Sequence, residues 1–181
     1  VYQLRLHDHN SAVDAYENAL RAMPEHPSAL EALAGIAFEQ RDFSRARELY
    51  SRLPEDKASI TPDVLAFRLG IIAEGLGDDH GALAAFSRAA ELMPNSPEIL
   101  AGLSRAAMRT GSLDAAIKAA RAQLELLPVN DVQAVAEARL ELAKLYAKVG
   151  DTEQAIRYNE LVLFENPRSQ PALRALYSCL L

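Results

Sequence analysis

Two short segments combine histidine and aspartate at spacings that could support metal or acid–base chemistry. Residues 7–9 read His-Asp-His and residues 78–80 read Asp-Asp-His. Imidazole and carboxylate groups bind zinc and exchange protons near neutral pH. Both segments fall where we expect a turn between two helices, and an aspartate in such a turn caps the backbone amides of the next helix. We therefore interpret both as exposed turn residues and expect no metal site.

Other catalytic arrangements are not visible in the sequence. The glycines Gly70, Gly75 and Gly77 do not form a phosphate-binding loop. Serine, cysteine and histidine are not arranged as an activated nucleophile. Cys179 is the single cysteine, and its apolar neighbours predict a buried position. We expect a chain that is not an enzyme and holds no cofactor.

Composition and charge limit the classes of partner. Half of the 181 residues are apolar and 24% are charged, which is typical of a folded, soluble protein. The net charge of -6 argues against nucleic acid, which needs a concentrated positive surface. No apolar run approaches the roughly 18 residues that span a bilayer. The first residues do not read as a signal peptide, and both the cytoplasm and the periplasm fit the sequence.

An internal repeat organises the whole chain. Alanines recur at intervals of 34, 36, 34 and 39 residues. Thirteen residues before each of the last four stands a leucine, and a small residue follows each leucine. The alanines are Ala12, Ala46, Ala82, Ala116 and Ala155; the leucine and small-residue pairs are Leu33-Ala34, Leu69-Gly70, Leu103-Ser104 and Leu142-Ala143. Small residues at these points let two helices approach closely, and the leucines fill the space between them.

Turn signals stand at fixed distances from the same alanines. Before three of them a glycine precedes Asp or Ser, as in Gly77-Asp78. Glycine provides the left-handed conformation that ends a first helix, and Asp or Ser caps the second. A proline follows four of the alanines by twelve residues and ends the unit: Pro24, Pro94, Pro128 and Pro167. The apolar residues between these signals recur at helical spacing, and no segment alternates as a strand does.

This pattern resembles the tetratricopeptide repeat, whose period is 34 residues. The resemblance implies an all-α fold: a right-handed superhelical solenoid of antiparallel helix pairs. The tryptophan favoured early in the repeat is absent, and Leu30, Ala66, Leu100 and Arg139 stand in its place. We expect one solenoid over residues 1–181, made of a truncated unit at 1–24, repeats at 27–53, 63–94, 97–128 and 136–167, and the start of another at 170–181.

The ends and junctions of the array carry further expectations. The period breaks between Pro54 and Pro62 and between Asp131 and Val135, and we expect a loop at the first break and a longer helix at the second. Solenoids usually finish with a polar cap, and this chain finishes on apolar residues partway through a first helix. We therefore expect a piece of a longer repeat protein, whose exposed last helix could also support self-association.

The resemblance implies that first helices line a concave groove that receives a peptide or helix of a protein partner. Helical spacing places acidic residues near the second unit, apolar ones in the middle and basic ones near the fourth and fifth. The predicted groove residues are Glu31, Phe38, Phe67, Ile71, Arg105, Met108, Arg109, Lys144 and Lys148. The alternative is that the apolar members are helix-packing core and the charges an ordinary solvated surface.

Two other functions of helical repeat proteins are alternatives to a peptide-binding scaffold. Family members that grip the carboxyl-terminal tail of chaperones use Lys and Asn on successive first helices; here Glu31, Gly35 and Val64 stand at those positions, and only Arg68 resembles part of such a clamp. A structural spacer or oligomerisation array, using the convex face or the ends, stays open. The composition is similar to that of bacterial repeat proteins that scaffold secretion, pilus or exopolysaccharide export machines.

Overall fold

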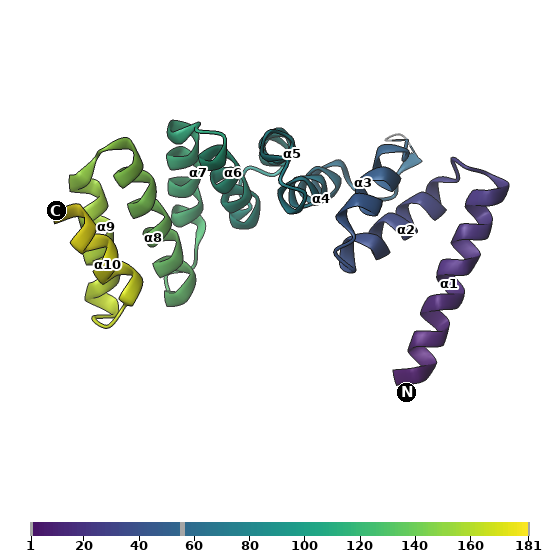
Figure 1. Cartoon of the computed structure of the whole chain (residues 1–181), viewed down its shortest axis with the longest axis horizontal. Helices are drawn as coiled ribbons and strands as arrows, with labels where there is room; N and C mark the ends of the chain where they lie inside the picture. Colours follow the sequence, from purple (N-terminus) through teal and green to yellow (C-terminus); the bar gives the residue numbers. More distant parts are fainter. Residues whose placement is uncertain (1, 55–56, 181) are drawn as a thin grey trace.

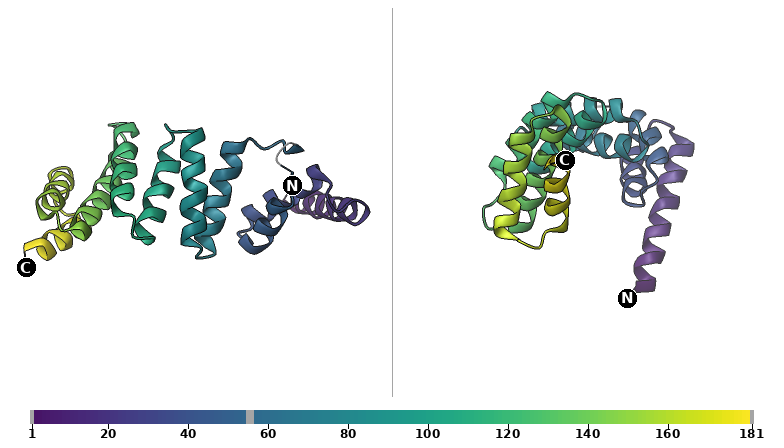
Figure 2. Two further views of the ribbon diagram at one scale, coloured as in Figure 1. Left: turned by 90° about the horizontal axis from the view of Figure 1, so that it is seen from above. Right: turned by 60° about the vertical axis from the view of Figure 1, so that its left-hand side comes forward.

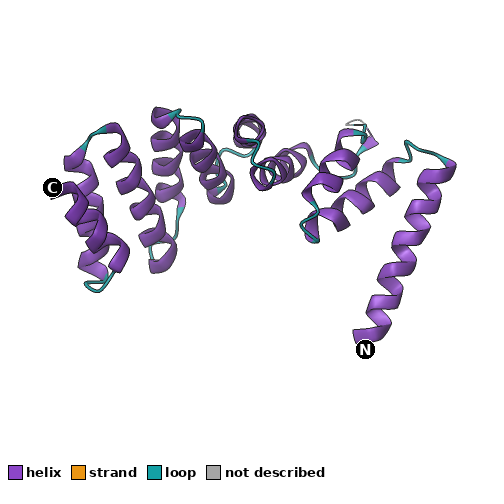
Figure 3. Cartoon of the chain, in the orientation of Figure 1, coloured by secondary structure: helices purple, strands orange, loops and turns teal. Residues whose placement is uncertain are grey.

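The computed structural model describes the backbone of residues 2–54 and 57–180 and the side chains of residues 11–54 and 57–179. Ten helices and no strand occur in these ranges (Figure 3). The helices are α1 (Tyr2–Ala22), α2 (Pro27–Glu39), α3 (Phe43–Ser51), α4 (Pro62–Gly75), α5 (Asp79–Leu92), α6 (Pro97–Arg109), α7 (Leu113–Leu126), α8 (Val132–Val149), α9 (Thr152–Glu165) and α10 (Gln170–Leu180). The predicted all-α solenoid is confirmed.

The helices form an arch in which first and second helices take opposite sides (Figure 1). The first helices α2, α4, α6 and α8 follow its inner side, and the second helices α3, α5, α7 and α9 follow its outer side. Figure 2 shows the same curvature from the side, with α1 extending away at the amino-terminal end. We call the side that carries the first helices the inner face and the other the outer face.

The repeat positions predicted from the sequence occupy the core. Ala46, Ala82, Ala116 and Ala155 are at most 1% exposed. The small residues after the leucines are buried as well, with Ser104 at 1% exposure. The hydroxyl of Ser104 donates to the carbonyl of Ala116, 3.0 Å away in the next helix. Short side chains at these points therefore let each first helix lie close against its second helix.

Helix ends follow the predicted turn chemistry with one exception. Asp42, Asp78, Asp131 and Asp151 each accept a hydrogen bond from the amide three residues later. Gly77, Gly111 and Gly150 have positive φ angles of 74° to 81°, in the region that glycine occupies without steric cost. Ser112 departs from the prediction, because its side chain makes no capping bond to α7.

The structure corrects the interpretation of the amino-terminal segment. α1 runs without interruption from Tyr2 to Ala22, so the turn predicted at residues 7–9 is wrong. Residues 1–22 contain neither glycine nor proline, and nothing in them ends a helix. The side chains of His7 to His9 lie outside the described residues. Ala12 is exposed, in contrast to the four equivalent alanines.

Of the other local predictions, the one for α8 is confirmed and the one for Cys179 is wrong. The additional residues before the fifth unit lengthen α8 backwards, as predicted, and Asp131 caps it. α3 ends early, at Ser51, and residues 52–54 and 57–61 lead to α4 without an α-helix of their own. Cys179 is half-buried, and not buried as predicted.

Candidate functional site

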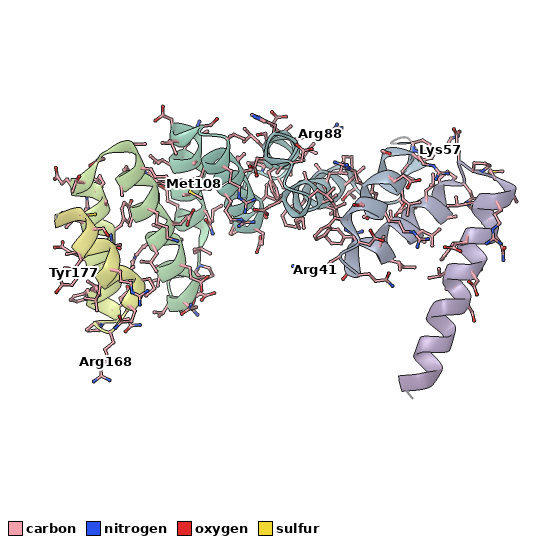
Figure 4. All side chains as sticks on the ribbon, viewed as in Figure 1. Arg41, Lys57, Arg88, Met108, Arg168 and Tyr177 are labelled. Carbon is pink, nitrogen blue, oxygen red and sulfur yellow. The ribbon has the colours of Figure 1, made fainter. Side chains whose placement is uncertain are left out.

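Apolar residues on two successive first helices, α4 and α6, form the centre of the candidate site. Phe67 and Ile71 of α4 are half-buried and pack beside the fully buried Phe86. The rings of Phe67 and Phe86 lie 6.0 Å apart. Met108 of α6 is half-buried against α7 and α8 (Figure 4). Each residue therefore contributes one part of its side chain to the core and leaves another part exposed.

Arg105 and Arg109 converge on one carboxylate. Arg105 of α6 donates to both oxygens of Glu74 in α4, over 3.0 Å from Nε and 3.1 Å from Nη2. Nη1 of Arg109 lies 3.2 Å from Glu74 Oε1 and 3.7 Å from Asp79 Oδ1. Hydrogen bonding from Arg105, together with the charges of Arg105 and Arg109, lowers the pKa of Glu74 against the opposing effect of burial. This cluster joins two successive first helices.

The two predicted lysines lie one unit further along. Nζ of Lys144 is 3.5 Å from an oxygen of Glu141 on the same helix, α8. Lys148 is exposed in the last turn of α8. The four predicted cations therefore do not form one uncompensated group, because acidic residues of the chain neutralise the two arginines and lie near Lys144.

The predicted groove residues of the second unit, Glu31 and Phe38, make contacts within the chain. Glu31 accepts a hydrogen bond of 2.7 Å from the backbone amide of Ser59 and so holds the irregular segment before α4. The ring of Phe38 lies 6.4 Å from that of Phe43. The guanidinium of Arg68 stands 5.3 Å from the centre of the Phe38 ring and donates over 2.7 Å to the Tyr50 hydroxyl.

Arg68 therefore connects the two sides of the break in the repeat. It reaches from α4 to α2 through Phe38 and to α3 through Tyr50. A guanidinium over an aromatic face contributes about 0.5–1 kcal/mol at a partly exposed site. Arg68, the one residue that resembles part of a chaperone-tail clamp, is therefore engaged by the chain's own side chains.

Sequence reasoning did not foresee the pairing of Glu74 with two arginines. Helical spacing from Phe67 and Ile71 places Glu74 on the same side of α4, but its partners are 31 and 35 residues away. The available signal was that a separation of 31 or 35 residues is close to one repeat, so that these residues lie on neighbouring first helices.

Within the described part of the chain, no group of three or more His, Cys, Asp or Glu residues is arranged to hold a metal. No described helix has the length and apolar character to cross a membrane.

Comparisons with known proteins agree with the helical-repeat architecture. A family model described as tetratricopeptide repeat matches residues 3–68 and 75–136. The structure of YrrB, described as a TPR protein with an unusual peptide-binding site, has a TM-score of 0.78 at 21% identity, over 94% of this chain and 84% of that one. The MamA protein gives 0.71 at 21% identity, over 87% and 82%.

A third similar structure is the C-terminal part of a TPR repeat-containing protein from Cytophaga hutchinsonii. It has a TM-score of 0.70 at 16% identity, over 91% of this chain and 65% of that one. No curated protein sequence matches the chain. At these identities the similar structures establish the fold.

Proposed function

The chain belongs to the tetratricopeptide repeat family, and from this premise we propose that it is a protein-interaction scaffold whose inner face holds a peptide or helix of a partner. The fold supports a scaffold role. The observation that carries the choice of face is the row of half-buried apolar residues on α4 and α6, Phe67, Ile71 and Met108. Partly exposed aromatic and methionine side chains are suited to anchoring a partner segment.

The charged residues of the inner face differ in sign between its two ends. Glu31 lies in α2 at one end, and Lys144 and Lys148 lie in α8 at the other. Between them, Glu74 neutralises Arg105 and Arg109. An acidic group of the partner would bind most readily near Lys148 and would compete with Glu74 for the arginines. Such charges set orientation and association rate more than affinity.

The test is recovery of the partner by charge-reversed variants. The parent, an Arg105→Glu/Arg109→Glu variant and a Lys144→Glu/Lys148→Glu variant are used as bait in lysate of the source organism, and recovered proteins are identified by mass spectrometry. A Lys57→Glu/Arg168→Glu variant makes the same charge change at two exposed residues in the segments before α4 and α10, outside the first helices. Circular dichroism verifies that each variant is helical.

We expect the parent and the control to recover one partner that both inner-face variants lose. The isolated partner segment should then bind the purified parent directly. Equal recovery by all four proteins would overturn the inner-face assignment. The compositional similarity to bacterial export scaffolds gives an expectation for the identity of that partner, namely a component of an envelope assembly.

Self-association through the carboxyl-terminal end is a second candidate. Phe164 of α9 is 88% exposed. Tyr177 of α10, labelled in Figure 4, is 71% exposed. Exposed aromatic residues near one end favour contact with another chain. Sedimentation equilibrium of the parent and of a Phe164→Ser/Tyr177→Ser variant tests this candidate. Concentration-dependent dimers in the parent alone would support it, and monomers in both would exclude it.

A further inference from the structure

A polar recess lies on the outer face, between the second helices α7 and α9. The end of α8 contributes its floor. Its lining includes Arg121 of α7, Tyr146 of α8, the cap residue Asp151, and Gln154, Arg157 and Tyr158 of α9. The recess has a volume of about 480 Å³. It is separate from the residues assigned to the inner face.

The two arginines of this recess have no partner in the described part of the chain. Neither Arg121 nor Arg157 forms an ion pair or hydrogen bond with a described side chain. Arg105 and Arg109 differ, because both are paired with Glu74. The one carboxylate in the recess, Asp151, already accepts a hydrogen bond at Oδ1 from the backbone N–H of Gln154. Positive charge therefore exceeds negative charge at this point of a chain whose net charge is -6.

The equivalent recess at the other end of the array contains an ion pair formed by the chain's own side chains. It lies between α1 and α3, where Glu17 and Arg45 form an ion pair of 2.6 Å. Glu17 stands five residues after its repeat alanine, as Arg121 does, and Arg45 stands one residue before its alanine, as Gln154 does. The two positions that carry opposite charges between α1 and α3 therefore carry an arginine and a neutral glutamine between α7 and α9.

The floor of the recess adds neutral hydrogen-bond donors and a flat apolar surface. The rings of Tyr146 and Tyr158 stack with centroids 5.7 Å apart and an angle of 9° between planes. Each phenol can donate one hydrogen bond, and neither hydroxyl is bonded to a described residue. Guanidinium, phenol and amide groups around a recess are the donors that a carboxylate requires.

We propose that this outer-face recess binds an acidic segment of a protein partner, whose Asp or Glu side chains supply the carboxylate that Glu17 supplies between α1 and α3. Arg121 and Arg157 bind the carboxylate, and the stacked tyrosines support the segment beside it. The proposal is independent of the inner face, so a scaffold with both sites could hold two proteins at once.

The experiment measures binding of a fluorescently labelled hexaglutamate peptide by anisotropy, with hexaglutamine as the neutral probe. Two variants remove the site in different ways. Arg121→Glu/Arg157→Glu reverses its charge. Gln154→Glu retains both arginines and provides an internal partner for Arg121, as at Glu17 and Arg45. Lys57→Glu/Arg168→Glu is the control of equal charge change, and Arg105→Glu/Arg109→Glu tests the inner face.

We expect hexaglutamate binding to weaken at least about tenfold in both recess variants, because each removes charge-assisted hydrogen bonds. The control and the inner-face variant should bind as the parent does. Unchanged binding in Gln154→Glu and in the charge-reversed variant would overturn the proposal, as would loss of binding in the inner-face variant alone. Absence of binding to the parent at about 1 mM peptide, the weak limit of specific association, would also overturn it.

Discussion

The carboxylate of Glu74 in α4 accepts two hydrogen bonds from the guanidinium of Arg105 in α6, across the gap between successive first helices. The side chain of Glu74 is 17% exposed, whereas that of Arg105 is 44% exposed. Arg109 contacts the same carboxylate. Glu74 is therefore the central residue of the cluster, and its removal leaves Arg105 without this carboxylate and Arg109 with Asp79 alone.

We expect Glu74→Gln to lower the free energy of unfolding at neutral pH by about 1 kcal/mol, because partly exposed ion pairs contribute little more. The pKa of Glu74 lies below the ordinary value of 4.5. Its contribution is therefore complete above that pH and is lost as pH falls through the lowered pKa. Urea unfolding across an acidic pH series should show a smaller difference between parent and variant at lower pH. Glu153→Gln, at an exposed site, is the control; a constant difference would contradict the assignment.

Two glycines in first helices should respond oppositely to substitution by alanine. A Cβ atom at Gly102 would lie 2.5 Å from Cε1 of the fully buried Phe86. A Cβ atom at Gly35 would meet Nη1 of Arg68 at an ordinary 3.7 Å. We expect Gly102→Ala to destabilise by about 1–3 kcal/mol through overpacking, and Gly35→Ala to stabilise by about 0.5–1 kcal/mol through helix propensity.

Thermal unfolding of both variants measures the contrast. Phe86→Leu in the Gly102→Ala background should cost less than Phe86→Leu alone, because the smaller side chain relieves the clash. If both glycine variants shift the midpoint in the same direction, close packing of Phe86 against Gly102 is not the determining factor.

These glycines show why the sequence predicts the array better than its details. Ala46 and Ser104 could be placed in the core because each recurs at a fixed offset from its own turn. The need for Gly102 comes from Phe86 in the preceding unit, and no local pattern reveals it. The inner-face charges present the same difficulty. Arg105 reads as a free cation until the fold brings Glu74, 31 residues earlier, beside it.

Arg41 occupies a backbone conformation that three other units give to glycine. Its φ angle is 60°, and those of Gly77, Gly111 and Gly150 are 74° to 81°. A left-handed conformation costs an L-residue roughly 1–2 kcal/mol, and glycine loses more freedom on folding. We expect Arg41→Gly to stabilise by about 0.5–1 kcal/mol and Gly111→Ala to destabilise by about 1 kcal/mol. Denaturant midpoints of the two variants test this; a less stable Arg41→Gly protein would show that the arginine side chain is needed.

Asn159 is a buried polar residue at a position where three other units place an aromatic ring, namely Tyr16, Tyr50 and Phe86. It is 1% exposed, and Nδ2 donates to the carbonyl of Ala155 over 2.8 Å. Oδ1 is buried and accepts no hydrogen bond from a described residue. Burial of an unpaired polar atom costs about 1–3 kcal/mol. We expect Asn159→Leu, of similar size, to stabilise the chain by about 1 kcal/mol.

The matched substitution Asn159→Asp keeps the shape and adds a charge. Because a buried unpaired carboxylate is costly, we expect this variant to lose at least about 2 kcal/mol at neutral pH and to recover part of it as acid protonates the group. Chemical denaturation of both proteins at neutral and acidic pH makes the comparison. A destabilised Asn159→Leu protein would mean that Oδ1 has a hydrogen-bond partner in solution that leucine cannot replace.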